Sequence, residues 1–110
     1  MQFSMLALFS LATLVAADKR PKVSVFSQPF YRGFSSDVDI DGRCYNLRLR
    51  ELQNNVRSIE IPDSISAYTI ECKGYRNWDC RNKAWEFSKS QKRIQDSDVT
   101  ALRCTKRPFV

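Results

Sequence analysis

The stretch VSVFSQPFYRGF, residues 23–34, opens with apolar and polar side chains in alternation. Alternation from Val23 to Phe26 is typical of a half-buried β-strand, and Gln28-Pro29 marks its end. The spacing Phe26-x4-Tyr31-x-Gly33 then places two aromatic side chains before a glycine, which adopts positive φ at little cost because it has no Cβ. The sequence therefore predicts a strand that folds back through a tight turn.

The chain carries this pattern twice. Ile70-x4-Tyr75-x-Asn77 repeats it 44 positions later, and asparagine is among the non-glycine residues most often found in the left-handed conformation. A triplet of mostly apolar residues also recurs at a spacing of 43: Val56, Ile59 and Ile61 match Val99, Leu102 and Cys104. The sequence therefore predicts an internal duplication in which each copy contains four short strands.

At these residues the chain resembles the beta/gamma-crystallin family, whose paired Greek keys each carry an aromatic-x4-aromatic-x-Gly signature. The resemblance implies an all-β fold, a two-sheet Greek-key sandwich of about eight strands. It places the domain at residues 23–105, with one Greek key at 23–62 and the other at 67–105. Residues 18–22 then form a charged lead and residues 106–110 a basic tail. Ile70 and Asn77 depart from the signature, which makes the second copy the degenerate one.

Local patterns predict two hairpins. Asp41-Gly42 is suited to a two-residue type I′ turn that pairs Phe34–Ile40 with Arg43–Leu49 and gathers the apolar side chains on one face. A second hairpin is expected around Asn82-Lys83, between residues 78–81 and 84–87. We expect the other strands around Val56–Ile61, at 67–71 and at 99–104, a short helical turn or loop at 52–55, and a surface loop at 88–98.

The string Asp-x-Asp-x-Asp-Gly at residues 37–42 also resembles the start of an EF-hand calcium loop. The twelfth position of such a loop is a bidentate glutamate, but here it is Arg48. A cation at the closing position, with strand patterning on both sides, favours the hairpin.

The four cysteines have two chemical interpretations. Cys44, Cys72, Cys80 and Cys104 form an even set in a small domain, which is typical of two disulfides. Zinc is the alternative, but no C-x2-C pair is present. Three disulfide pairings are possible, and the spacing does not choose among them.

Calcium is the cofactor that the family resemblance raises. Microbial members often bind Ca²⁺ through Asn/Asp-Asn/Asp-x-x-Ser/Thr-Ser, and the matching stretches here are residues 53–58 and 96–101. In the first, Arg57 replaces the hydroxyl ligand and places a positive charge where the cation would lie. In the second, Thr100 remains and would combine with the carbonyl of Asn55. We therefore expect no required cofactor and at most one weak calcium site, at Asn55 and Thr100.

The N-terminal segment predicts export. Residues 1–17 carry no charge, are apolar from Met5 to Val15, and end in the small residues Ala16-Ala17, as a signal peptide does, although the leading end lacks Lys or Arg. The alternative is a buried N-terminal helix. The apolar run is too short to span a bilayer core of about 30 Å, and no later segment replaces it. We expect a secreted, extracellular protein without a transmembrane segment.

The composition argues against an enzyme. The chain has no histidine, which excludes Ser-His-Asp and Cys-His catalysis and His-ligated zinc. The paired carboxylates Asp37/Asp39 and Asp96/Asp98 are the glycosidase alternative, but each pair lacks an apolar pocket in sequence. The sequence therefore predicts a non-enzymatic protein.

The charge balance suggests a partner. Eighteen Lys and Arg against 12 Asp and Glu give a formal net charge of +6, which attracts anionic cell walls, glycans or lipid headgroups. Some small secreted proteins of the beta/gamma-crystallin family resemble antimicrobial or killer-toxin modules, so the resemblance implies an antimicrobial or effector-like protein. We expect it to be a monomer. Nucleic acid is not expected, because Tyr45, Trp78, Trp85 and Phe87 are placed in core strands. The candidate binding residues lie in one loop and at the C-terminal end: Lys89, Lys92, Arg93, Arg103, Lys106 and Arg107.

Two other interpretations remain open. Scattered basic residues are usually a solvated surface with no partner. A stable extracellular structural or stress-associated protein would fit the same family and the same cysteines.

Overall fold

Two antiparallel sheets form the molecule, and each contains strands from both halves of the chain. The computed structural model describes residues 21–63 and 68–108. One sheet has the strand order β2-β1-β4 and the other β3-β7-β5-β6. The strands of the first are β1 (Lys22–Gln28), β2 (Arg32–Asp39) and β4 (Ser58–Glu60). The second contains β3 (Cys44–Asn46), β5 (Tyr68–Asn77), β6 (Arg81–Phe87) and β7 (Ala101–Pro108).

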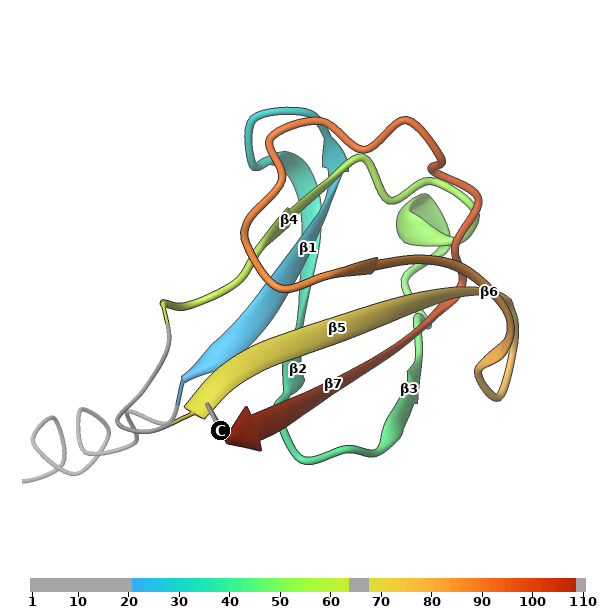
Figure 1. Cartoon of the computed structure of the whole chain (residues 1–110). Helices are drawn as coiled ribbons and strands as arrows, with labels where there is room; N and C mark the ends of the chain where they lie inside the picture. The colour runs from blue at the N-terminus through green and yellow to red at the C-terminus, as the bar shows by residue number, and fades with distance from the viewer. Residues whose placement is uncertain (1–20, 64–67, 109–110) are drawn as a thin grey trace, which may run out of the picture.

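The connections confirm the Greek-key sandwich (Figure 1). β1 and β2 pair as neighbours, β3 crosses to the other sheet, and β4 returns to lie beside β1. In the second half β5 and β6 pair, and β7 returns beside β5. The described residues contain seven strands, because the third strand of the second half is reduced to a single bridge between Gln91 and Ile59 of β4. The rest of residues 88–98 is loop, as expected.

The structure confirms the duplication but corrects one spacing. Val25 of β1 lies opposite Ile59 of β4, and Gly74 of β5 lies opposite Leu102 of β7. The last strands of the two copies, β4 and β7, are thus related by 43 positions, as predicted. Their first strands, β1 and β5, are related by 49. The 44-residue alignment of Ile70, Tyr75 and Asn77 with Phe26, Tyr31 and Gly33 is therefore wrong.

The backbone of the two turns supports the same spacing of 49. Phe30, Tyr31 and Gly33 have positive φ after β1, and the residues with positive φ after β5 are Asp79, Cys80 and Asn82. Asn82, not Asn77, is therefore the counterpart of Gly33. Asn77 is instead the last residue of β5, where it pairs with Arg81.

The first predicted hairpin does not form. Gly42 has φ of 79°, but Asp41 does not have the positive φ that a type I′ turn also requires. The Asp41 carboxylate instead accepts hydrogen bonds from the Arg43 backbone and the Tyr45 hydroxyl, while the Gly42 N–H donates to the Cys104 carbonyl. Asp41-Gly42 therefore turns the chain from one sheet to the other. β2 pairs with β1, and β3 pairs with β7.

The second predicted hairpin is displaced. Asn82 and Lys83 lie within β6, and the turn consists of Trp78, Asp79 and Cys80. Trp78 is consequently 44% exposed, which corrects its placement in a core strand. Trp85 is buried and stacks on Phe87, with ring centroids 4.8 Å apart.

The core lies between the two sheets and includes side chains of the connection between β3 and β4. The fully buried apolar side chains come from both halves: Val23, Val25, Leu52, Val56, Ile59, Val99 and Leu102. Leu52 belongs to the 3-10 helix η1 (Arg50–Leu52), close to the predicted helical turn. Ile94 is also buried, so the loop before β7 covers part of the core.

Both disulfides lie in the four-stranded sheet. Cys72 of β5 pairs with Cys104 of β7, directly opposite it in the ladder, and both are fully buried. Cys44 of β3 pairs with Cys80 in the β5–β6 turn, which joins the two halves of the chain. The structure thus selects one of the three pairings that the sequence left open.

The expected boundaries are close but not identical to the observed strands. β1 begins at Lys22, inside the charged lead, and β7 continues to Pro108, where it pairs with Tyr68. Residues 106–108 are therefore strand and not tail. The signal-peptide prediction for residues 1–17 lies outside the described residues. Across residues 21–63 and 68–108, no helix has the length and apolar character needed to cross a membrane.

Candidate functional site

The first calcium-like stretch, residues 53–58, ends beside the β1–β2 turn. Arg57 stands at the position of the expected hydroxyl ligand, and its Nε donates to Asn55 Oδ1 at 2.9 Å. The fully buried Ser58 hydroxyl donates to the Gln28 carbonyl at 2.7 Å and accepts from the Tyr31 N–H at 3.1 Å. Its role is therefore to hold the turn. Arg57 therefore places a guanidinium where the motif has a hydroxyl ligand, and it binds the Asn55 side-chain oxygen.

The second stretch, residues 96–101, forms an ion pair with another arginine, Arg76 of β5. Arg76 Nη1 and Nη2 donate to the two Asp96 carboxylate oxygens at 2.9 and 2.6 Å, and Asp98 lies 3.8 Å from Nη1. The hydrogen bonds from Arg76 lower the pKa of Asp96. The buried Thr100 hydroxyl donates to the Arg76 carbonyl at 2.9 Å.

These contacts do not fit a calcium ion at Asn55 and Thr100. The Thr100 hydroxyl donates to the Arg76 carbonyl, and the Arg76 guanidinium neutralises Asp96, so this site lacks the net negative charge that favours a calcium ion. Among the residues that the structure describes, no cluster of three or more His, Cys, Asp or Glu side chains has metal-binding geometry.

The predicted basic residues do not form one patch. Lys89 lines a surface pocket with Asp63, and Lys106 lines another with Asp39 and Asp41. On β7, Arg107 Nε lies 2.7 Å from Glu71 Oε1. Arg103 is partly buried, and its guanidinium carbon lies 6.0 Å from the centroid of the Tyr75 ring. These four cations therefore have either a nearby carboxylate or an aromatic neighbour.

A different group of cations lies at a pocket that no carboxylate lines. Arg57 and Arg93, 36 positions apart in sequence, line one surface pocket of about 370 Å³, which we call the arginine pocket. Its lining contains no carboxylate: Pro29, Arg57, Arg93, Ile94, Gln95 and Ser97. Lys92 is exposed beside it in the chain. Within residues 21–63 and 68–108, none of the three cations forms an ion pair.

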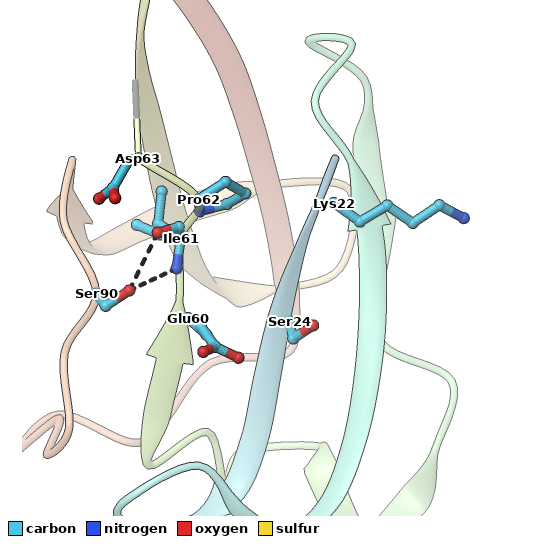
Figure 2. A pocket seen from close by; sticks show the side chains of 7 residues that line it. All are labelled: Lys22, Ser24, Glu60, Ile61, Pro62, Asp63 and Ser90. Carbon is cyan, nitrogen blue, oxygen red and sulfur yellow. Dashed lines mark hydrogen bonds between the residues drawn. The ribbon is translucent and has the colours of Figure 1, made fainter. Parts of the chain in front are cut away.

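Another surface pocket has mixed charge (Figure 2). Glu60, Asp63 and Lys22 line it, and the Ser90 hydroxyl lies between the N–H and the carbonyl of Ile61, at 2.8 and 3.1 Å. In Figure 2 the Lys22 side chain extends away from the other lining residues. Ser90 therefore fastens the loop after β6 to the end of β4.

The carboxylates considered for catalysis all have partners. Asp37 accepts a hydrogen bond from the Ser24 hydroxyl at 2.6 Å, and Asp39 lies 3.7 Å from Lys22 Nζ. Asp96 and Asp98 share Arg76. A glycosidase needs one carboxyl group with a raised pKa, but the direction for Asp96 is downward.

The sequence did not reveal the groups that matter most here. Nothing in the sequence marks Arg76 as the partner of Asp96 in the second calcium-like stretch, and Arg57 stands out only as one of many basic residues and as an obstacle to calcium. Phe30 was also missed, although its ring contacts Arg93 at 4.9 Å from the centroid. A repeat alignment at a spacing of 49 would match Arg76 with Ser27, and no sequence signal joins Arg57 to Arg93.

Comparison with solved structures identifies the fold. The N-terminal domain of protein S superposes with a TM-score of 0.61 at 16% identity, over 79% of this chain and 98% of that chain. A betagamma-crystallin domain from Flavobacterium johnsoniae gives a TM-score of 0.60 at 19% identity, over 74% of this chain and 91% of that one. The chain has the beta/gamma-crystallin fold. No family model matches the sequence, and no curated protein matches it.

A third structure with the crystallin fold bears on the metal. The beta gamma-crystallin domain of Abundant Perithecial Protein from Neurospora crassa, in its Ca²⁺-bound form, matches with a TM-score of 0.61 at 13% identity, over 82% of this chain and 93% of that chain. Similarity at this level shows the shared crystallin fold and not a shared ligand. In the present chain Arg57 lies within the first calcium-like stretch, and Arg76 of β5 pairs with Asp96 of the second.

Proposed function

We propose that this protein is a secreted, non-enzymatic module that binds anionic components of cell surfaces. The observation that carries the proposal is the uneven placement of countercharge. Lys89, Lys106 and Arg107 lie near carboxylates, whereas the arginine pocket and Lys92 do not. The arginine pocket is therefore a local group of cations that no lining carboxylate offsets, on a chain whose net charge is +6.

The binding energy in this proposal is electrostatic. Attraction between exposed charges decreases with salt, because the screening length falls from about 30 Å at 0.01 M to about 3 Å at 1 M ionic strength. The protein should therefore bind anionic vesicles or cell-wall fragments at low salt and dissociate as salt is added. Antimicrobial or effector activity would follow from such binding, and nucleic acid is not the intended target of an exported protein.

A cosedimentation experiment tests this function. The protein is mixed with phosphatidylglycerol vesicles, phosphatidylcholine vesicles and isolated cell walls over a salt series. Two double variants remove equal charge: Lys92→Gln/Arg93→Gln removes unpaired cations, and Lys106→Gln/Arg107→Gln removes cations near carboxylates. The first should weaken anionic binding more than the second. Equal binding to both kinds of vesicle, or binding that salt does not change, would refute the proposal.

The alternative is a durable extracellular structural protein. Two disulfides in one sheet, one of them fully buried, favour this role. Its signature is high thermal stability that collapses on reduction, with no salt-sensitive binding to any of the surfaces above.

A further inference from the structure

The arginine pocket lies where three segments meet. Pro29 belongs to the β1–β2 turn, Arg57 immediately precedes β4, and the other lining residues belong to the loop before β7. In Figure 1 this loop, coloured orange, passes beside the β1–β2 turn at the top of the molecule. The lining residues are therefore far apart in the chain and come together only in the folded protein.

Backbone hydrogen bonds fix the position of Arg93 from both sides. The Lys92 carbonyl, just before it, accepts from the Phe30 N–H at 2.8 Å. The Ile94 N–H, just after it, donates to the Arg57 carbonyl at 2.8 Å. Ile94 is also buried in the core. The two arginines and Phe30 are thus held on one connected backbone frame, which lowers the entropy lost on binding a ligand.

Each guanidinium has one orienting contact and keeps donors free. Arg57 uses Nε for Asn55, and its terminal nitrogens form no hydrogen bond within the described residues. The Arg93 guanidinium carbon lies 4.9 Å from the centroid of the Phe30 ring, and this cation–π contact leaves its N–H groups free. Two planar guanidinium groups with free donors match the oxygens of a phosphate group.

Phe30 supplies a second observation. Its large apolar side chain is 47% exposed at the tip of a turn. Its backbone has φ of 61°, a conformation unfavourable for a bulky residue. An exposed phenyl ring beside a cationic pocket is suited to a membrane surface, where apolar side chains enter the headgroup boundary next to basic residues.

We propose that the arginine pocket binds a phosphate group, with Arg57 and Arg93 as its two cationic ligands. Gln95 and Ser97 offer neutral donors at the same pocket. The phosphate can be free or belong to the headgroup of an anionic phospholipid, in which case Phe30 inserts beside it. This inference rests on the proposed function for its cell-surface target, but the phosphate site itself is tested separately.

The first experiment titrates the protein with inorganic phosphate and follows backbone amide NMR shifts. We expect saturable shifts at residues 57 and 93–97, which Arg57→Gln/Arg93→Gln abolishes. The matched control, Arg48→Gln/Arg50→Gln, removes the same charge from exposed residues outside this pocket and should leave the phosphate shifts unchanged. An unchanged amide spectrum during titration of the wild type would overturn the phosphate site.

The second experiment separates the two sources of phosphate with vesicles. We expect Arg57→Gln and Arg93→Gln each to lower affinity for phosphatidylglycerol vesicles by about fivefold, the usual effect of one cation near such a surface. Phe30→Asn keeps a residue that tolerates positive φ. It should weaken vesicle binding further while inorganic phosphate still binds.

The outcomes distinguish this inference from the proposed function. Anionic vesicle binding that falls equally in the pocket and control variants would overturn the pocket but keep the function. If inorganic phosphate binds at the pocket but anionic vesicles do not bind the protein, the phosphate site is supported. The same result would overturn the lipid headgroup as the source of the phosphate, and with it membrane binding as the proposed function. Heparin, a sulfated glycan, tests whether the pocket prefers another anion. If the wild type binds heparin more tightly than phosphatidylglycerol vesicles, and Arg57→Gln/Arg93→Gln loses that binding, phosphate is the wrong ligand.

Discussion

Arg76 and Asp96 face each other across the end of β5 through two parallel hydrogen bonds, 2.9 Å from Nη1 to Oδ1 and 2.6 Å from Nη2 to Oδ2. The pair holds the segment before β7 against β5, and the Asp96 carbonyl also accepts a hydrogen bond from Trp85 Nε1 at 3.1 Å. Asp96 thus connects the loop before β7 to β5 through Arg76 and to β6 through Trp85.

The Arg76–Asp96 pair predicts a loss of stability in acid. Arg76 lowers the pKa of folded Asp96 below its ordinary value of 3.8. The pair therefore stabilises the folded state fully above about pH 4, and this contribution is lost as pH falls through the lowered pKa. The melting temperature of the wild type should exceed that of Asp96→Asn by a few degrees at neutral pH, and the difference should shrink as the pH falls below about 4.

The control for this pH series is Asp63→Asn, because Asp63 forms no ion pair among the described residues. Its melting curve should follow that of the wild type at each pH. A constant gap between Asp96→Asn and the wild type down to pH 2 would contradict the assignment.

Arg57 predicts weak calcium binding that one substitution improves. We expect less than about 1 °C change in melting temperature when excess calcium replaces a chelator, since a ligand stabilises only in proportion to its occupancy. Arg57→Thr removes the charge and restores the hydroxyl. It should raise calcium affinity roughly tenfold, about 1.4 kcal/mol, by isothermal titration. Tight calcium binding by the wild type would show that this account of Arg57 is wrong.

Gly33 and Gly42 predict different costs for the same substitution. Both have positive φ, 84° and 79°, so alanine is strained at each by about 1–2 kcal/mol. At Gly33 the new Cβ would also overlap the Ser27 hydroxyl, which accepts a hydrogen bond from the Phe34 N–H. At Gly42 the nearest atom is a methyl carbon of Thr105 at an ordinary 3.5 Å.

We therefore expect Gly33→Ala to cost about 2–4 kcal/mol in the free energy of unfolding and Gly42→Ala about 1–2 kcal/mol. Denaturant titration measures both values. Equal losses would mean that the close approach of Ser27 contributes nothing, and that only the backbone conformation matters.

The two disulfides predict an order of reduction. Cys44 and Cys80 are partly exposed, whereas Cys72 and Cys104 are fully buried. Mild reductant should therefore open Cys44–Cys80 first, as alkylation and peptide mapping would show. Each bridge closes a loop of more than thirty residues and should contribute roughly 3–4 kcal/mol. Opening of Cys72–Cys104 before Cys44–Cys80 would contradict this order.

Sequence alone determined the class of fold, because strand alternation, and the pattern within each copy of the repeat, depend on residues near one another in the chain. The alternation at Val23 and Val25 buries both side chains as expected, and the recurrence of Ile59 at Leu102 marks equivalent strands. Export from residues 1–17 stays a prediction from sequence.

Tertiary structure decided everything that depends on which strands become neighbours. Asp41-Gly42 has the same local pattern in a hairpin and in a crossing between sheets, and only the hydrogen bond from Gly42 to Cys104 selects the crossing. The pairing of Cys44 with Cys80 and the meeting of Arg57 with Arg93 follow from that crossing topology. Contacts between distant residues form when both sheets bury one shared core, and no local pattern encodes that shared burial.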